Sequence, residues 1–233
     1  MTRHELKEQV QHDAFKESVG KALNYTASHR SQVTRWAVIA AGVLIIAGAA
    51  FWYMSYRRSV RQQDLEAAFV VLSAPVGPAG QFGKSYPTED AKRDASMKAL
   101  ADVIAKDGGS KEGLIAQYYR GTLKAQRQDS NGAQADLRTV ADSNSDVAPL
   151  AKIALAQLYA GENRVPEAQE LLRGIVNKPT PLVSKAQAEV MLAQLDQATN
   201  PQQAKKILDS LKSPNQDPAV SRAVDQLSTQ MER

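Results

Sequence analysis

The chain of 233 residues contains no cysteine, only three histidines and only two tryptophans. The absence of cysteine excludes disulfide frameworks, thiolate metal sites and cysteine nucleophiles. All three histidines, His4, His12 and His29, lie near the N-terminus, and no His, Cys or Trp occurs after residue 56. Most of the chain therefore lacks the groups that enzymes use most often for acid–base and nucleophilic catalysis. We expect a protein that is not an enzyme and that carries no metal or other cofactor.

A large excess of charge of either sign is also absent. Residues 1–56 contain six basic and four acidic side chains, and residues 57–233 contain 23 and 21, so each part has a net charge of +2. This distribution leaves no basic stripe of the kind that binds nucleic acid. The glycine-rich segments 77–83 and 108–109 lack the strand context or the spacing of a phosphate-binding loop. The sequence thus favours neither a nucleic acid nor a small-molecule substrate as the ligand.

A long apolar run is present near the N-terminus. The twenty-one residues from Trp36 to Tyr56 contain no charged side chain. A helix of this length spans roughly 30 Å, the thickness of the hydrocarbon core of a bilayer. Aromatic rings, which favour the headgroup level, occur at both ends and basic residues follow, so the predicted membrane anchor comprises Trp36, Trp52, Tyr53, Tyr56, Arg57 and Arg58. A cleaved signal peptide, the alternative, would have a shorter apolar core and a small-residue cleavage site.

The orientation of this span depends on charge and on domain size. The twenty residues before the span contain four basic side chains and the twenty after it contain three, which is nearly balanced. Long C-terminal domains cross a membrane largely regardless of charge. We therefore expect the N-terminus in the cytoplasm and residues 57–233 on the outer face.

Proline and helix-capping residues divide the chain beyond the span. All ten prolines follow residue 56, and no stretch alternates polar and apolar residues as a half-buried strand would. Residues 57–72 are predicted to continue the apolar helix, and residues 73–87 to form a loop. Thr88, followed by two acidic residues, predicts the start of a helix that ends at residues 108–109.

A spacing of small and large residues then recurs along the chain. A small residue in one predicted helix is followed 11 or 12 residues later by a small residue in the next, with large apolar residues four and seven positions further on. The three blocks are Gly121, Ala133, Leu137 and Val140; Ala156, Ala168, Leu172 and Ile175; and Ala193, Ala204, Leu208 and Leu211. Because two helices approach closely only where neither carries a bulky side chain, this spacing predicts helical hairpins.

The pattern resembles the tetratricopeptide repeat, in which Tyr159 would supply the first-helix aromatic and Pro181 and Pro214 would close two repeats. Lys124 and Asp196 occupy the position of Tyr159 in the other blocks and depart from the pattern. An ordinary helical bundle with alanine-rich contacts is the alternative. We predict an all-α fold with a single N-terminal transmembrane helix followed by a tetratricopeptide-like helical-hairpin solenoid.

Stacked hairpins form an extended concave surface that is lined by side chains of their first helices. The partner-binding residues predicted on this surface are Tyr118, Thr122, Ile153, Gln157, Val190 and Gln194. Their aromatic, aliphatic and amide groups suit a peptide or a partner helix better than an anionic ligand. The alternative is that these side chains only pack against the helix predicted over residues 57–72.

The predicted organisation has five parts. They are a cytoplasmic segment (1–35), a transmembrane helix (36–56), a helical stalk with a loop and a first helix pair (57–111), the tetratricopeptide-like repeats (112–217) and a C-terminal capping helix (218–233). Val220, Val224 and Leu227 lie on one face of the capping helix.

In this layout the chain is similar to the YfgM-like ancillary subunits of the bacterial SecYEG translocon, most closely in GLIAQYYRGTLKAQ (113–126) and LAKIALAQLYAGENRVPEAQELL (150–172). The resemblance implies a bacterial inner-membrane protein whose C-terminal domain lies in the periplasm. It also implies contacts with lipid, with the SecYEG translocon and with a membrane-anchored PpiD-like chaperone, and a role in the handover of secreted polypeptides. Two alternatives stay open: a scaffold subunit of another cell-envelope or respiratory complex, and a hydrolase that uses only Asp, Ser and Lys.

Overall fold

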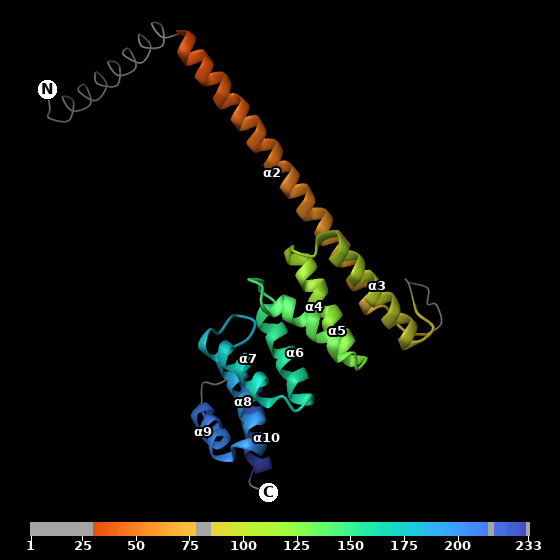
Figure 1. Cartoon of the computed structure of the whole chain (residues 1–233), viewed down its shortest axis with the longest axis vertical. Coiled ribbons are helices and arrows are strands. Elements are labelled where there is room, and N and C mark those ends of the chain that lie inside the picture. Colours follow the sequence, from red (N-terminus) through yellow and green to blue (C-terminus); the bar gives the residue numbers. More distant parts are fainter. Residues whose placement is uncertain (1–29, 78–84, 214–216, 232–233) are drawn as a thin grey trace, which may run out of the picture. The chain divides into compact units, whose positions relative to one another are not determined.

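The computed structural model describes residues 30–77, 85–213 and 217–231. The helices in these ranges are α2 (Arg30–Ser73), α3 (Glu89–Asp107), α4 (Lys111–Gln126), α5 (Ser130–Ala141), α6 (Ala148–Gly161), α7 (Val165–Asn177), α8 (Lys185–Thr199), α9 (Pro201–Leu211) and α10 (Pro218–Met231) (Figure 1). The described residues form no strand, only an isolated bridge between Val76 and Tyr86. The all-α fold is therefore confirmed. Most of the predicted N-terminal segment, residues 1–29, lies outside the described residues.

The chain divides into two compact units, residues 1–59 and residues 60–233. In the first unit, α2 exposes its large apolar side chains all around, including Trp36, Trp52, Tyr53 and Tyr56. The rings of Trp52 and Tyr56, one helical turn apart, stack with centroids 6.0 Å apart. Among the described residues, one helix is long and apolar enough to cross a membrane, and it includes the whole predicted span.

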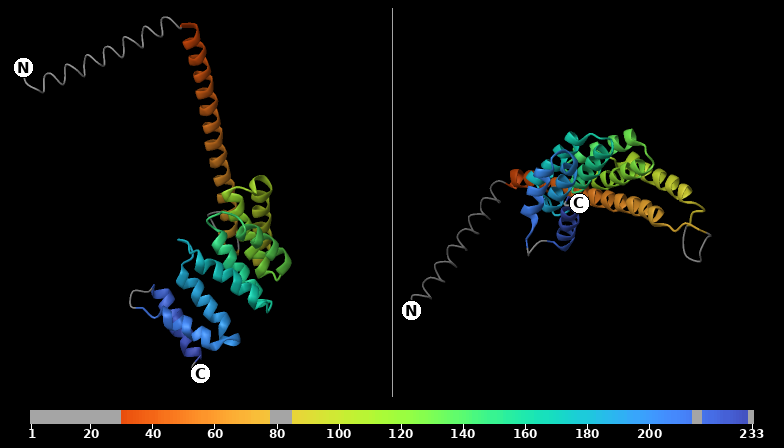
Figure 2. Two further views of the ribbon diagram at one scale, coloured as in Figure 1. Left: turned by 60° about the vertical axis from the view of Figure 1, so that its left-hand side comes forward. Right: turned by 90° about the horizontal axis from the view of Figure 1, so that it is seen from below.

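The second unit, which we call the repeat unit, contains the three predicted hairpins, α4–α5, α6–α7 and α8–α9. In Figure 2 the three hairpins, coloured green, teal and blue in chain order, lie one after another. We call the helices of each hairpin its first and second helix. All twelve residues of the three predicted blocks are buried, and most of their side chains are less than 3% exposed. The small residues thus lie where the helices of each hairpin contact each other, as predicted.

Gly121 shows how closely two of these helices approach. A Cβ atom added at Gly121 would lie 2.9 Å from Cγ of Leu137 and 3.2 Å from Cβ of Asp136, both on α5. Contacts under 3.0 Å require a neighbour to move, and Leu137 is fully buried. The α4–α5 contact therefore requires a residue without a side chain, whereas Ala156 and Ala193 serve at the same position of the next two hairpins.

The helix pair within residues 57–111, which precedes the three hairpins, has the same register as they do. Ser96, Leu100 and Val103 on α3 have the spacing of the second-helix residues in the later hairpins, and all three are buried. Ala68 on α2 is 2% exposed and lies five residues before the end of its helix, as Gly121 and Ala156 do. Residues 60–73 of α2 thus act as the first helix of an additional pair with α3.

The turns inside the hairpins explain why the third predicted block is one residue shorter. Gln128 and Asn163, seven residues after Gly121 and Ala156, both adopt the left-handed conformation, with φ of 62° and 61°. In the third hairpin Asn200 ends α8 and also caps α9, where its side chain accepts a hydrogen bond from the backbone N–H of Gln203 at 3.2 Å. Asn200 therefore both ends α8 and caps α9, so the third hairpin has one residue fewer, and Asn200 does not adopt the left-handed conformation.

The C-terminal helix α10 covers the last hairpin. Val220, Val224 and Leu227 are buried against a cluster that includes Ala193, Ala204, Leu208 and Leu211 of α8 and α9. The prediction that these three residues share one face is confirmed. Pro214, predicted to close the third repeat, lies outside the described residues, and Pro181 lies in the connection between α7 and α8.

Candidate functional site

The six predicted partner-binding residues occupy two positions of the repeat. We number positions from the small residue of each first helix: Ala68, Gly121, Ala156 and Ala193. Tyr118, Ile153 and Val190 lie at position −3, and Thr122, Gln157 and Gln194 at position +1. The position −3 residues are half-buried and pack against the cores of the repeat unit. Gln157 and Gln194 are exposed, and neither side chain bonds to any described residue.

A hollow of about 360 Å³ brings Gln157 and Gln194 together between α6 and α8. Its remaining lining residues are mainly apolar: Ala156, Ala160, Leu172, Met191 and Leu195. The hollow therefore has an apolar floor and two amide groups that are free to donate and accept hydrogen bonds.

A second hollow, of about 380 Å³, lies between the end of α2 and α4 in the repeat unit. It is lined by Glu66, Phe69, Val70, Leu72, Ser73 and Tyr119. The ring of Phe69 meets the ring of Tyr119 edge to face, with centroids 4.9 Å apart. The rings of Tyr118 and Tyr119 also meet edge to face, with centroids 5.3 Å apart. Burial, with a smaller contribution from Tyr119, raises the pKa of Tyr118 above its ordinary value of 10.0, so its hydroxyl stays neutral.

The two hollows are lined from the same positions of the repeat. Each uses positions +1 and +4 of one first helix and position −2 of the next first helix. These residues are Phe69, Leu72 and Tyr119 in the α2–α4 hollow, and Gln157, Ala160 and Met191 in the α6–α8 hollow. Because the same geometry recurs two hairpins apart, we regard both hollows as parts of one surface, which we call the first-helix groove.

Sequence reasoning missed the half of this groove that α2 contributes. Phe69, Leu72 and Tyr119 are not among the predicted partner-binding residues, because the recurring spacing of small residues assigns no repeat position to residues 57–72. The signal that could have found them is the spacing of Ser96, Leu100 and Val103, which repeats the second-helix pattern of the later hairpins.

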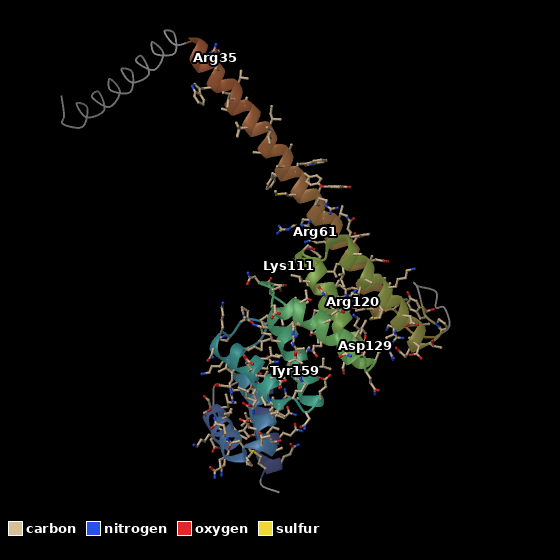
Figure 3. All side chains as sticks on the ribbon, viewed as in Figure 1. Arg35, Arg61, Lys111, Arg120, Asp129 and Tyr159 are labelled. Atoms are coloured by element: carbon tan, nitrogen blue, oxygen red, sulfur yellow. The ribbon has the colours of Figure 1, made fainter. Side chains whose placement is uncertain are left out.

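Ion pairs hold the last part of α2, which belongs to the repeat unit, against α3 and α4, and so stabilise the α2–α4 hollow. Nε of Arg61 lies 3.4 Å from the carboxylate of Glu112 on α4, and the Glu112 side chain is only 9% exposed (Figure 3). Nζ of Lys106 on α3 lies 3.1 Å from the carboxylate of Asp64. Leu65 and Ala68 add buried apolar contacts with Leu100, Val103 and Ala116.

A larger hollow, of about 640 Å³, lies among α7, α8 and α9, outside the first-helix groove. Asp196 and Gln169 line it, and Nε2 of Gln169 donates a hydrogen bond to the Asp196 carboxylate at 2.6 Å. Burial raises the pKa of Asp196 above its ordinary value of 3.8, despite the opposing effects of Arg173 and of this hydrogen bond. Gln169 and Asp196 thus bond to each other, so size alone does not make this hollow the binding site.

Among the three hairpins, only α6–α7 has an aromatic residue at position +3 of its first helix, and the other two have charged residues there. Tyr159 on α6 bonds through its hydroxyl to Arg138 of α5 at 2.6 Å, and the Arg164 guanidinium lies 3.9 Å from the centre of its ring (Figure 3). At the same position Lys124 forms an ion pair with Asp136 at 2.8 Å, and Asp196 bonds to Gln169. Each hairpin fills this position with a different polar contact.

Among the described residues, no three His, Asp or Glu side chains lie close enough together to hold a metal ion. The groups that the first-helix groove presents are aromatic rings, aliphatic side chains, amides and the Glu66 carboxylate. Such groups bind a ligand through apolar contacts and hydrogen bonds.

Comparison with protein families identifies the fold. The model of the tetratricopeptide repeat-like domain matches residues 33–181, which run from α2 through α7. No curated protein and no solved structure matches the chain. The matched region includes α2, in agreement with the register of Ala68 and Ser96. Because the match covers more than half of the chain, the chain belongs to the tetratricopeptide repeat-like domain family.

Proposed function

We propose that this protein is a membrane-anchored module that binds a protein partner through the first-helix groove. The observation that carries the proposal is the recurrence of two hollows at the same repeat positions, one of them with two amides that bond to no described residue. Tetratricopeptide repeat-like domains are typically protein-interaction modules without catalytic activity.

The chemistry of the groove favours an extended polypeptide segment as the ligand. A carboxamide both donates and accepts hydrogen bonds, as does each peptide group of an extended chain. Gln157 and Gln194 can therefore pair with the backbone of the segment, while the apolar floor between them takes a side chain. The other predicted residues at these two positions, Tyr118, Thr122, Ile153 and Val190, would support and flank the contact.

The apolar part of α2 supports anchoring in a membrane. Its large apolar side chains are exposed over a length that matches a bilayer, and Trp36, Trp52, Tyr53, Tyr56, Arg57 and Arg58 would lie at the interfaces. We propose a single-pass protein of the bacterial inner membrane with its N-terminus in the cytoplasm and its repeat unit in the periplasm.

The proposed partner is the SecYEG translocon together with a membrane-anchored PpiD-like chaperone. Support comes from the family and from the resemblance in layout to YfgM-like subunits, in which one span is followed by short tetratricopeptide-like hairpins. In this role the groove would assist the handover of secreted polypeptides. A scaffold subunit of another envelope or respiratory complex is the second candidate.

Purification in mild detergent, followed by mass spectrometry, tests this proposal. We expect Sec components with the wild-type chain and their loss with the double variant Gln157→Arg and Gln194→Arg, which fills the α6–α8 hollow with charge. The matched control is Glu170→Arg with Lys206→Glu, which changes exposed side chains on second helices. Recovery of another envelope complex without any Sec component would favour the second candidate, and equal recovery with both double variants would exclude the groove.

A further inference from the structure

The two hollows of the first-helix groove differ in chemistry although they share positions. At positions +1 and −2 the α2–α4 hollow has Phe69 and Tyr119, where the α6–α8 hollow has Gln157 and Met191. Among the described residues of the repeat unit, the four most exposed large apolar side chains are Val70 (55%), Val76 (37%), Tyr119 (37%) and Leu182 (51%). Two of the four, Val70 and Tyr119, line the α2–α4 hollow, which marks it as an apolar patch on the surface.

A carboxylate without a partner lies beside this patch. Glu66 lines the α2–α4 hollow, is exposed, and forms no ion pair or hydrogen bond with any described side chain. The neighbouring acidic side chains Asp64 and Glu112 are both paired, with Lys106 and Arg61. The hollow therefore offers aromatic faces and one available negative charge, and it is complementary to an apolar side chain that has a basic neighbour.

The repeat sets the distance between the hollows. Each first helix packs mainly on the second helix that lies between it and the next first helix. Because packed helices have axes about 8 to 10 Å apart, one step between first helices covers about 10 to 20 Å, and the two steps between the hollows cover about 20 to 40 Å. An extended chain advances about 3.3 Å per residue, so about six to twelve residues bridge this distance.

We infer that the partner segment is extended and carries two anchors about six to twelve residues apart. One anchor is an aromatic or large aliphatic side chain adjacent to Lys or Arg, which occupies the α2–α4 hollow beside Glu66. The other is an unbranched or γ-branched apolar side chain, such as Met or Leu, that enters the α6–α8 hollow between Gln157 and Gln194. This inference depends on the proposed function and specifies the chemical class of the partner.

Fluorescently labelled peptides and the full chain in mild detergent test the inference. The peptides contain Lys-Phe and Leu in a Ser-rich background, with the two anchors about three, nine or fifteen residues apart, and in both chain directions. Fluorescence anisotropy is expected to show the tightest binding at the middle spacing in one direction. Replacing Phe by Ser in that peptide should lower the affinity about tenfold, as for a buried aromatic anchor.

Two variants of the protein make the assignment specific. Tyr119→Ser should weaken binding of the best peptide about tenfold, whereas Leu182→Ser, which removes a more exposed apolar side chain outside both hollows, should leave it unchanged. Glu66→Gln should reduce the preference for Lys over Ser by about twofold to fivefold. Glu170→Gln, an exposed acidic control on α7, should not.

The result that would overturn the inference is binding that is equally tight at all three spacings or unaffected by Tyr119→Ser. Such a result leaves the proposed function intact if the Gln157→Arg and Gln194→Arg variant still loses the partner. Unchanged far-UV circular dichroism of Tyr119→Ser ensures that a loss of binding does not reflect unfolding.

Discussion

The α4–α5 and α8–α9 hairpins have small residues at equivalent crossing positions, but their buried carboxylates have different partners. Asp136 on α5 and Asp196 on α8 are both about 5% exposed. Asp136 accepts bonds from Arg120 at 2.6 Å and forms an ion pair with Lys124 at 2.8 Å, whereas Asp196 bonds only to the neutral amide of Gln169. Asp136 thus pairs with two cations of its own hairpin, whereas Asp196 bonds to an amide of the preceding hairpin, although the small residues set the helix crossings in the same way in both.

The pKa values of the two carboxyl groups follow from this difference. Burial raises the pKa of Asp136, but Arg120 and Lys124 lower it by more, so it lies below its ordinary value of 3.8. At Asp196 burial prevails and the pKa is raised. The ionised form therefore stabilises the fold at Asp136 and destabilises it at Asp196.

The largest expected effect is that of removing the charge of Asp136. Asp136→Asn leaves two cations without their counterion inside the α4–α5 hairpin, which costs about 3 to 5 kcal/mol for a fully buried pair. Because about a fifth of the Arg120 and Lys124 side chains is exposed and can regain water, we expect a loss of about 2 to 3 kcal/mol. Urea unfolding followed by circular dichroism measures it.

The control is Asp196→Asn, which keeps an oxygen acceptor for Gln169. We expect an unchanged or slightly increased free energy of unfolding at neutral pH. If the two variants lose the same amount, the distinction between a paired and an unpaired carboxylate is wrong.

The next effect concerns the crossing residue of the same two hairpins. Gly121→Ala should destabilise the protein by about 1 to 2 kcal/mol because the new Cβ would meet Leu137. Elsewhere in a helix the same change gains about 1 kcal/mol. At the equivalent position of α8, Ala193→Gly should instead lose about 1 kcal/mol through helix propensity. A more stable Gly121→Ala variant would show that α4 and α5 are not in close contact.

The dependence on pH should separate the two carboxylates. The stabilisation from Asp136 is complete above the ordinary pKa of 3.8 and is lost as the pH falls through its lowered pKa. The cost of ionised Asp196 is complete above its raised pKa, decreases as the pH falls below that value, and is gone at the ordinary pKa of 3.8. Unfolding of wild type and both Asn variants between about pH 7 and pH 3 should give differences of opposite sign that vanish at different pH values. Coincident titrations would contradict the assignment.

The smallest effect concerns the turns within the hairpins. Gln128 adopts a φ of 62°, which a residue with a β-carbon adopts at a cost. Gln128→Gly should therefore stabilise the protein by about 0.5 to 1 kcal/mol. In the α8–α9 turn, Asn200 has a φ of −150° and its side chain caps α9, so that Asn200→Gly should destabilise. Thermal unfolding in detergent compares the two, and stabilisation by both would show that the turns do not differ.

Much of the fold could be predicted because close helix contacts require small residues at a fixed spacing. Gly121, Ala133, Ala156 and Ala168 revealed the hairpins by this rule alone. A helix pair is predicted within residues 57–111, but the spacing rule does not extend to it, because the connection between α2 and α3 is longer and because Ser96, its second small residue, is polar. Residues 57–72 continue the helix of the span, as predicted, and this continuity gives no sign that the end of α2 also belongs to the repeat.

The candidate site could be predicted only in part. Exposed Gln157 and Gln194 follow from the helical period. The half-burial of Ile153 and Val190 does not, because position −3 faces the core to a degree set by the angle between neighbouring hairpins. The bond between Arg138 and Tyr159 likewise joins two hairpins, and no local spacing encodes how they stack.

Site-specific photocrosslinking in living cells tests the central claim most directly, that the first-helix groove contacts the partner. A photoreactive amino acid is placed at Gln157 or Gln194 in the groove, and at Glu170 or Lys206 on the second helices α7 and α9 as controls. We predict crosslinked partner bands from positions 157 and 194 and none from positions 170 and 206. Crosslinks that arise only from the second helices, or equally from all four positions, would contradict the account.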